Sequence, residues 1–244
     1  SNGIKMHLLG SLARPSAASL VWHFHDYPSL RPVTNRLIKS LKYRCDAVVA
    51  VSESVAADVR AQVGSSVHVQ TIWNSVDLER FTPTGSTLDL DALAGLPARA
   101  DAVVSVGLVA TFARWKGHLL FLDMMQSLVK TRPTVRGYIV GGPLYETHAS
   151  QFSLDELREA VAARDLTGIV GLTGFVSDAP AALRSLDVVV HASTAAEPFG
   201  LVVAEAMAAG RAVVISNNGG VAELVASGTT GLAYDSGSVE GLTS

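Results

Sequence analysis

The sequence predicts an α/β protein built from doubly wound parallel β-sheets. Short apolar runs recur along most of the 244 residues, and most of them are rich in Val and Ile without polar alternation. Runs of this kind are typical of strands that are buried on both faces of a sheet. Segments with helical spacing lie between them, and strand–helix alternation favours parallel sheets covered by helices. Hydrophobic residues make up 48% of the chain and charged residues 17%, which fits a globular protein with sizeable cores.

The apolar runs give the predicted strands, and the amphipathic segments give the predicted helices. We expect strands at 20–25, 47–51, 67–72, 102–108, 135–140, 169–173, 188–192, 212–215 and 231–234. We expect helices at 32–44, 54–62, 117–131, 154–164, 181–185, 201–209 and 221–226.

A change in composition at about residues 82–100 indicates a connection between two domains. Thr, Pro, Gly and Ser are frequent there, and these residues favour turns. We therefore predict one domain over 1–85 and a second over 86–244. The first has only three predicted strands, and no closing helix is predicted after Tyr234. The sequence is thus expected to be the middle of a longer protein.

Composition also limits the class of protein. The net charge of −3 gives no indication of bulk nucleic-acid binding. The single cysteine, Cys45, excludes an internal disulfide and fits a reducing compartment, so we expect a cytoplasmic protein. No apolar run reaches the roughly 18–20 residues that a membrane-spanning helix needs.

The segment 197–210 is the most informative part of the sequence. Glu197 lies in a Pro/Gly turn, and Glu205 lies about one and a half turns into the predicted helix that begins near Phe199 and Gly200. The free N–H groups of the first helical turn can hold an anion. A carboxylate on either side can accept hydrogen bonds from sugar and ribose hydroxyl pairs. This arrangement suits a nucleoside diphosphate sugar.

A second segment, 106–117, follows a predicted strand and opens a helix. Arg114 and Lys116 lie on this loop, at the strand end where open α/β sheets bind ligands. Their charge could stabilise a diphosphate leaving group as the bond to the sugar breaks. The alternative is that both are solvated loop cations.

The segment 197–210, together with 211–215 and 219–225, resembles the donor-site signature of the family-4 retaining glycosyltransferases. The resemblance covers most of the chain, and segment 67–83 is similar to a hinge segment of the same family, with Ser75 in place of a usual Gly. It implies the GT-B fold, in which two Rossmann-like domains face a cleft, here with an incomplete N-terminal domain. The first strand, its glycine-rich loop and a C-terminal crossing segment would be absent.

The resemblance implies transfer of a hexose-type sugar from a nucleoside diphosphate to an acceptor hydroxyl, with retention at the anomeric carbon. Glu197 would hold the donor sugar and Glu205 the ribose. Backbone N–H groups near Phe199, Gly200 and Leu201 would hold the diphosphate, together with Lys116 and Arg114. The family usually has an Arg five residues before the Lys, where this sequence has Thr111. Arg114 would then reach the phosphate from another position.

The histidines at the end of the predicted strand 20–25 form a separate candidate site. His23 and His25 point to the same face of an extended strand. The resemblance implies that His25 touches the donor sugar or β-phosphate, whereas the ordinary alternative is a packed, hydrogen-bonded histidine. A zinc site would need further ligands that the sequence does not offer clearly.

No metal or other cofactor is expected. Asp89 and Asp91 form an Asp-x-Asp pair of the kind that binds a metal in the other large glycosyltransferase architecture, but they lie in the predicted connection. In the GT-B family, Arg and Lys take the place of the metal.

Gly219 and Gly220 leave two interpretations open. The pair either lets the backbone approach the donor closely or makes a tight strand-to-helix turn. Glu223 would then be a surface charge or a further nucleotide contact.

The predicted partners are a nucleotide-sugar donor and an acceptor that the sequence leaves unidentified: a glycan, a lipid-linked compound or a small molecule. Arg36, Lys39 and Lys42 share one face of a predicted helix, with Leu37, Ile38 and Leu41 opposite. This pattern describes an ordinary surface helix. The alternative is peripheral contact with anionic lipid at the inner membrane face.

Two other functions stay open from the sequence. One is a non-catalytic nucleotide-sugar-binding module, which Thr111 favours and the intact Glu197, Glu205 and Lys116 oppose. The other is a GT-B nucleotide-sugar epimerase, which would be expected to use acid–base carboxylates and histidines instead of the glutamate signature.

Overall fold

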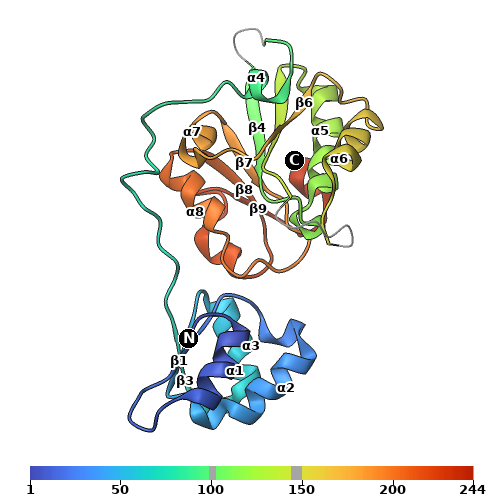
Figure 1. The fold of residues 1–244 in the computed structure, drawn as a ribbon. Helices are drawn as coiled ribbons and strands as arrows, with labels where there is room; N and C mark the ends of the chain where they lie inside the picture. The colour runs from blue at the N-terminus through green and yellow to red at the C-terminus, as the bar shows by residue number, and fades with distance from the viewer. Residues whose placement is uncertain (99–102, 144–149, 244) are drawn as a thin grey trace. The chain divides into compact units, whose positions relative to one another are not determined.

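The computed structural model describes residues 1–98, 103–143 and 150–243 (Figure 1). Two compact units share the chain. The first comprises 1–75 with two short later segments, 196–200 and 219–223. The second comprises 76–195, 201–218 and 224–244. Each unit contains a purely parallel sheet, which confirms the predicted fold class.

The first unit contains a three-stranded sheet in the order β1-β2-β3. The strands are β1 (Val21–Phe24), β2 (Ala47–Ala50) and β3 (His68–Thr71), and the helices are α1 (Ile4–Ala13), α2 (Pro32–Leu41) and α3 (Glu53–Val63). Helix α3 shows why the local sequence folds this way. Ser52 caps its first turn, and Val55, Val59 and Val63 recur at helical spacing and are fully buried.

Helix α1 was not among the predicted helices, because its apolar pattern is inverted. His7 and Ser11 are fully buried. Met6, Leu9 and Leu12 are exposed. Periodicity assigns apolar residues to the buried face, so a helix that buries a histidine and a serine gives no such signal.

The second unit contains a six-stranded sheet in the order β6-β5-β4-β7-β8-β9, in which every neighbouring pair is parallel. The strands are β4 (Val104–Val109), β5 (Val135–Val140), β6 (Val170–Gly174), β7 (Val188–His191), β8 (Ala212–Ser216) and β9 (Leu232–Tyr234). All lie within or close to predicted strands; Ala102, the start of one prediction, lies outside the described residues. The order reverses between β4 and β7, which makes that position a topological switch point.

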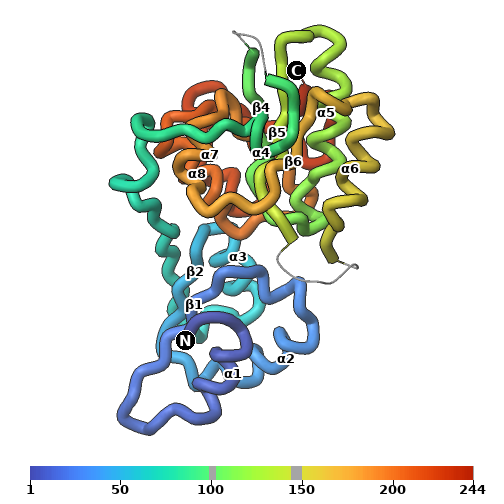
Figure 2. The backbone as a smooth tube through the Cα atoms, turned by 45° about the horizontal axis from the view of Figure 1, so that its top comes forward, coloured from blue at the N-terminus to red at the C-terminus, as the bar shows by residue number. Residues whose placement is uncertain are grey.

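Helices cover both faces of this sheet (Figures 1 and 2). They are α4 (Leu90–Ala94), α5 (His118–Thr131), α6 (Leu154–Ala162), α7 (Ala179–Arg184), α8 (Leu201–Ala208) and α9 (Val239–Thr243). Helices α5, α6 and α9 share one face, and α7 and α8 lie on the other (Figure 1).

The prediction that no helix follows Tyr234 is wrong, since α9 begins at Val239 and buries Leu242. Ser238 starts this turn by accepting a hydrogen bond from the Gly241 N–H at 2.9 Å. The predicted helix at 221–226 is a 3₁₀ turn over Gly220–Leu224.

The sequence placed the domain division at 85/86, whereas Val76 and the residues after it group with the second unit. Two hydrogen bonds tie this stretch to α7 and its end. The Arg184 Nε donates to the Ser86 carbonyl at 2.8 Å, and the Leu88 N–H donates to Ser185 Oγ at 2.7 Å. Turn-forming residues therefore mark a segment that packs on the second unit.

Candidate functional site

The switch point of the second unit is where two loops meet. One follows β4 and carries Arg114 and Lys116, and the other follows β7 and leads towards α8. The Thr194 N–H donates to the Trp115 carbonyl at 2.8 Å and so joins the two loops. A Cβ on Gly117 would overlap the Ala192 carbonyl oxygen, and its φ of +78° also favours glycine. The loop that carries Lys116 is therefore fixed against the end of β7.

Lys116 ends a short 3₁₀ turn, Arg114–Lys116, directly before α5. Its Nζ lies 4.0 Å from the centroid of the Trp115 ring. The side chain is half-buried at the carboxyl edge of the sheet, the edge at which open α/β sheets bind ligands. A positive charge there can bind an anion such as a phosphate.

Arg114 has two neighbours that the sequence did not reveal. Its Nη2 donates to the Glu156 Oε1 at 2.6 Å, and its guanidinium lies 4.3 Å from the Phe152 ring centroid. Glu156 also closes the capping box of α6 with Ser153. The Ser153 N–H and then Arg114 lower the pKa of the Glu156 carboxyl. Arg114 thus helps to hold α6, and its role in donor binding stays a prediction.

The first residue of α5, His118, is a buried neutral imidazole. It lies 5.7 Å from both the Phe112 and Phe152 rings, measured between centroids. Burial, and then the charge of Lys116, lower its pKa to about 4. His118 therefore adds no positive charge beside Lys116 at neutral pH.

Helix α8 begins at Leu201, close to the predicted start near Phe199 and Gly200. The N–H groups of its first turn have no partner within the helix. Gly200 before it has a φ of +87°, and Phe199 is buried. Glu205 is the fifth residue of α8. Burial raises the pKa of its carboxyl, while the charge of Arg80 acts in the opposite direction. In the second unit, Lys116, Leu201 and Glu205 thus all lie on segments that follow β4 or β7.

Glu197 belongs to the first unit with the rest of segment 196–200. Its side chain is largely buried, at 9% exposure. Its backbone carbonyl accepts hydrogen bonds from the Gly220 N–H at 2.7 Å and from the Tyr27 hydroxyl at 3.3 Å. Tyr27 also pairs with Ser54 Oγ at 2.9 Å. Sequence reasoning missed Tyr27, because its partners lie far away along the chain.

The glycine pair packs against the backbone at Glu197 and Pro198. A Cβ on Gly219 would lie 2.5 Å from the Glu197 carbonyl oxygen, and one on Gly220 would overlap the Pro198 carbonyl oxygen. Gly219 also has a φ of +89°. The close approach of these two backbone segments by itself explains why both positions are glycine.

Glu223, in the same unit, accepts three hydrogen bonds. The donors are the Glu53 N–H at 2.9 Å, the Ser54 N–H at 2.7 Å and Trp73 Nε1 at 2.9 Å. The carboxylate thus caps the first turn of α3, where free N–H groups favour negative charge. The sequence left Glu223 as a surface charge or a nucleotide contact; no sequence signal pairs it with residues 53 and 54.

His25 follows β1 at the carboxyl edge of the first sheet. Its ring centroid lies 4.0 Å from that of His23, and its Nε2 is buried without a hydrogen-bond partner. Asp26, the next residue, forms a 3.3 Å ion pair with Arg31. Both Asp26 and His25 line a cavity in this unit.

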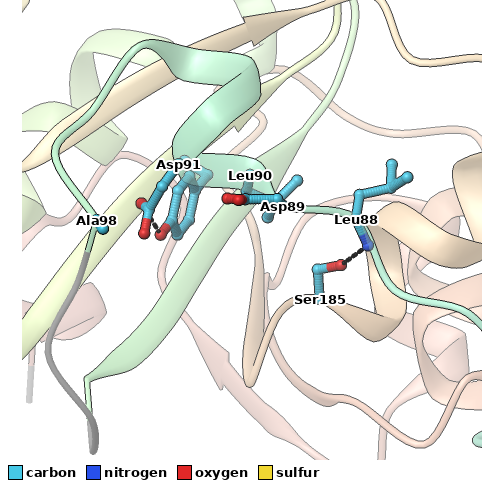
Figure 3. A pocket seen from close by; sticks show the side chains of 7 residues that line it. Leu88, Asp89, Leu90, Asp91, Ala98 and Ser185 are labelled. Carbon is cyan, nitrogen blue, oxygen red and sulfur yellow. Dashed lines mark hydrogen bonds between the residues drawn. The ribbon is translucent and has the colours of Figure 1, made fainter.

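The two residues of the Asp-x-Asp pair, Asp89 and Asp91, stabilise α4 and its contacts. Asp89 caps the helix by accepting the Ala92 N–H at 3.0 Å. Asp91 is buried and accepts hydrogen bonds from Tyr138 at 2.7 Å and from Arg136 at 2.8 Å. Both residues line a cavity of about 310 Å³ (Figure 3). Within the described ranges, no three His, Cys, Asp or Glu side chains are grouped so as to hold a metal ion.

Helix α2 departs from the predicted pattern at two residues. Leu37 is 48% exposed, although it was expected on the buried side. Lys42 donates from Nζ to the Val63 carbonyl at 2.7 Å, so it is engaged inside the unit. Arg36 and Lys39 are exposed as predicted.

In the part of the chain that the structure describes, no helix has the length and apolar character to span a bilayer.

Comparison with protein families gives two matches. Residues 100–244 match the model described as "Glycosyl transferases group 1", and residues 1–80 match the model described as "Glycosyltransferase Family 4".

Curated relatives are biosynthetic transferases. The chain is 35% identical over 197 residues to the lipopolysaccharide core biosynthesis mannosyltransferase LpsB of Rhizobium meliloti (strain 1021), covering 80% of this chain and 52% of LpsB. It is 33% identical over 207 residues to the mannosyltransferase LpcC of Rhizobium leguminosarum bv. viciae, covering 84% of this chain and 54% of LpcC. The chain thus spans about half the length of these relatives.

Solved structures with the same fold include Anabaena HepE in complex with UDP. It has a TM-score of 0.85 and 27% identity, over 99% of this chain and 65% of HepE. HepE has also been solved with UDP-glucose, with a TM-score of 0.84. Sucrose-phosphate synthase from Thermosynechococcus elongatus, at 23% identity and a TM-score of 0.82, covers 99% of this chain and 61% of its own and shares the fold.

Proposed function

The chain belongs to the group 1 glycosyl transferases of GT-B fold, and from this we propose that its whole protein transfers a sugar from a nucleoside diphosphate sugar to an acceptor hydroxyl. The observation that carries the proposal is the switch point between β4 and β7. Lys116 follows one of these strands and the start of α8 follows the other. HepE, solved with UDP and with UDP-glucose, supports a nucleotide-sugar donor by similarity.

We propose one chemical task for each predicted donor residue, taking the residues of each unit by themselves. The free N–H groups at the start of α8 and the Lys116 ammonium bind the diphosphate and stabilise its charge as it leaves. Glu205 accepts hydrogen bonds from the ribose. Glu197 accepts hydrogen bonds from the donor sugar, and His25 contacts the sugar or the β-phosphate. Arg114 adds charge when it is released from Glu156.

We propose that the reaction retains the anomeric configuration and needs no metal. No carboxylate is assigned as a nucleophile, so the leaving phosphate would take the proton of the acceptor hydroxyl on the same face. Lys116 and Arg114 would then stabilise the charge of the leaving diphosphate, as a metal ion does in the other large glycosyltransferase architecture.

A second candidate function is nucleotide-sugar binding without catalysis. Two observations favour it: Thr111 stands where the family usually has an arginine, and Arg114 is paired with Glu156. In that case the whole protein would bind the donor but would neither hydrolyse nor transfer it.

The donor site can be tested by thermal shift on this chain with UDP, GDP, ADP and dTDP, with and without magnesium. A ligand at about 100 times its Kd adds roughly 2.7 kcal/mol to the free energy of unfolding. We expect one diphosphate to raise Tm equally with and without magnesium.

Lys116→Ala should remove most of that shift, because it deletes the charge at the diphosphate. Lys130→Ala, at the far end of α5, is the matched control and should keep it. Equal shifts in the two variants would mean that Lys116 has no part in binding.

Catalysis is tested on the whole protein through Glu197→Ala. Nucleotide binding should be retained, while transfer should fall by about 10²-fold, as expected when a group acting mainly in the transition state is lost. Turnover equal to that of the wild type would remove Glu197 from the proposed mechanism.

A further inference from the structure

A network of hydrogen bonds in the first unit holds the turn that carries Glu197. The buried Tyr27 hydroxyl donates to the Glu197 carbonyl at 3.3 Å and accepts from the Gly220 N–H at 3.2 Å. It also bonds to Ser54 Oγ at 2.9 Å. A phenol has one proton and two lone pairs, so these three bonds use the hydroxyl fully when Ser54 is the donor. All four residues belong to the same unit.

Close packing brings the two late segments of this unit against the same hydroxyl. A Cβ on Gly219 would lie 2.6 Å from the Tyr27 hydroxyl oxygen. One on Gly220 would lie 2.5 Å from the Oγ of Ser52, which is fully buried at the start of α3. Glu197 and Gly219 also pair in a parallel bridge. Tyr27 therefore lies where the two late segments meet.

Glu223 fastens the second of these segments to α3. Its carboxylate accepts hydrogen bonds from the N–H groups of Glu53 and Ser54 and from Trp73 Nε1. Ser54 is shared between the two anchors, because its N–H bonds to Glu223 and its Oγ bonds to Tyr27. The free N–H groups at a helix start favour such a carboxylate. The segments that contain Glu197 and Glu223 are therefore both anchored beside the first turn of α3.

The surroundings of Tyr27 keep its hydroxyl protonated. Burial raises the pKa of the hydroxyl above the ordinary 10.0, the bonds with Ser54 and Gly220 lower it, and the charges of Glu223 and Glu197 raise it again. At neutral pH the hydroxyl therefore keeps the proton that it donates to the Glu197 carbonyl. The effect of the Glu197 charge also means that this largely buried carboxylate lies near the hydroxyl.

We propose that Tyr27 and Glu223 are positioning residues, which orient the Glu197 carboxylate by holding its turn. The inference rests on the proposed function, in which Glu197 binds the donor sugar. Tyr27 bonds to the main chain of Glu197, and Glu223 holds the segment on which that main chain packs. A misplacement of about 1 Å can cost 10²-fold in rate, so the hold on this turn affects transfer although neither residue contacts the sugar.

The test is a double-mutant cycle on transfer by the whole protein. Tyr27→Phe should lower kcat by about 10-fold, the size expected for loss of one buried hydrogen bond, and should leave the KM for the donor within about 2-fold. Added to Glu197→Ala, it should cause no further loss, because it acts through Glu197. A purely structural role would instead multiply the two losses. Tyr43→Phe, at an exposed tyrosine of the same unit, is the matched control.

A second variant and a second measurement do not depend on Tyr27→Phe activity. Glu223 is exposed, so Glu223→Ala leaves no cavity and should lower kcat in the same way, whereas Glu79→Ala, at another exposed glutamate, should not. Hydrogen exchange of the whole protein measures the hold directly. In Tyr27→Phe the Gly220 amide should exchange about 10-fold faster than in the wild type, while the amides of β2 should be unchanged.

Three outcomes would overturn the proposal: wild-type kcat in both Tyr27→Phe and Glu223→Ala, losses that multiply in the double variant with Glu197→Ala, or equal exchange of the Gly220 amide in Tyr27→Phe and the wild type. A wild-type protein that transfers no sugar would instead reject the proposed function. A Glu197→Ala variant as active as the wild type would remove Glu197 from the mechanism, and both positioning residues with it.

Discussion

Glu205 shows how a residue proposed to bind the donor acts against the stability of its own unit. Burial raises the pKa of its carboxyl above the ordinary 4.5. The folded chain then binds this proton more tightly than the unfolded chain does, so the free energy of unfolding falls as pH rises above 4.5. At neutral pH the ionised, half-buried carboxylate is destabilising, which a ribose hydroxyl pair would offset by hydrogen bonding.

Glu205→Gln should therefore raise the Tm of the unliganded chain at pH 7, by about 2 °C, and reduce the nucleotide-dependent shift. The difference in Tm should vanish below pH 4.5, where the wild-type carboxyl is protonated as well. Thermal unfolding at several pH values measures both effects. A variant that is less stable at pH 7 would show that the carboxylate has a stabilising partner.

Single residues also mark how far the sequence could lead to the site. Lys116 and Glu205 were proposed from their places near a strand end and a helix start together with the family resemblance, and their roles stay predictions. Tyr27 and the contacts of Glu223 were missed because the partners are distant in sequence and are brought close only by the fold. Arg114 was also proposed, but its pairing with Glu156 could not be foreseen.

Among the secondary-structure elements, α4 depends on one buried carboxylate. Asp91 bonds to Tyr138 and to Arg136, whose side chain is 14% exposed. Asp91→Ala would leave a largely buried guanidinium without its carboxylate, which should lower the free energy of unfolding by about 3 kcal/mol. Asp89→Ala removes only the helix cap and should cost about 1 kcal/mol.

Urea unfolding followed by far-UV circular dichroism compares these two variants. Equal costs would show that the Asp91 ion pair contributes no more than a cap.

The elements themselves were predictable where burial follows a simple period. Strand β5 was predicted at its observed bounds, because all of Val135–Val140 except Arg136 is buried in the parallel sheet and the strand ends in the β-forming residues Tyr138, Ile139 and Val140. Helix α1 buries His7 and Ser11 and exposes leucines, so periodicity could not find it. Helices α4 and α9 are only five residues long and depend on caps and packing.

Among the described residues, His7 in the first unit and His118 in the second are buried and have a pKa of about 4. These imidazoles cannot take up a proton until the pH approaches 4, whereas in the unfolded chain they do so near 6.5. Stability is therefore lost in both units as the pH falls from 6.5 to 4.

For His118 this loss should be on the order of 3 kcal/mol. His118→Leu should flatten the pH dependence of the free energy of unfolding, measured by urea unfolding at several pH values, while His68→Gln should leave it unchanged. An unaltered profile in His118→Leu would mean that other groups cause the acid sensitivity.

The strand order of the second unit also determines when the edge formed by β4 and β7 can form during synthesis. Strand β4 pairs with β5 through a crossover that contains α5, but its other neighbour, β7, comes only after β5, α6, β6 and α7 have been made. Closing so long a loop is slow, because its entropy is lost before the contacts are gained. A ribosome-bound chain that ends before β7 therefore carries Lys116 on an open sheet edge with no opposing loop. A nucleotide bound at the proposed donor site would then stabilise the late pairing of β7 with β4.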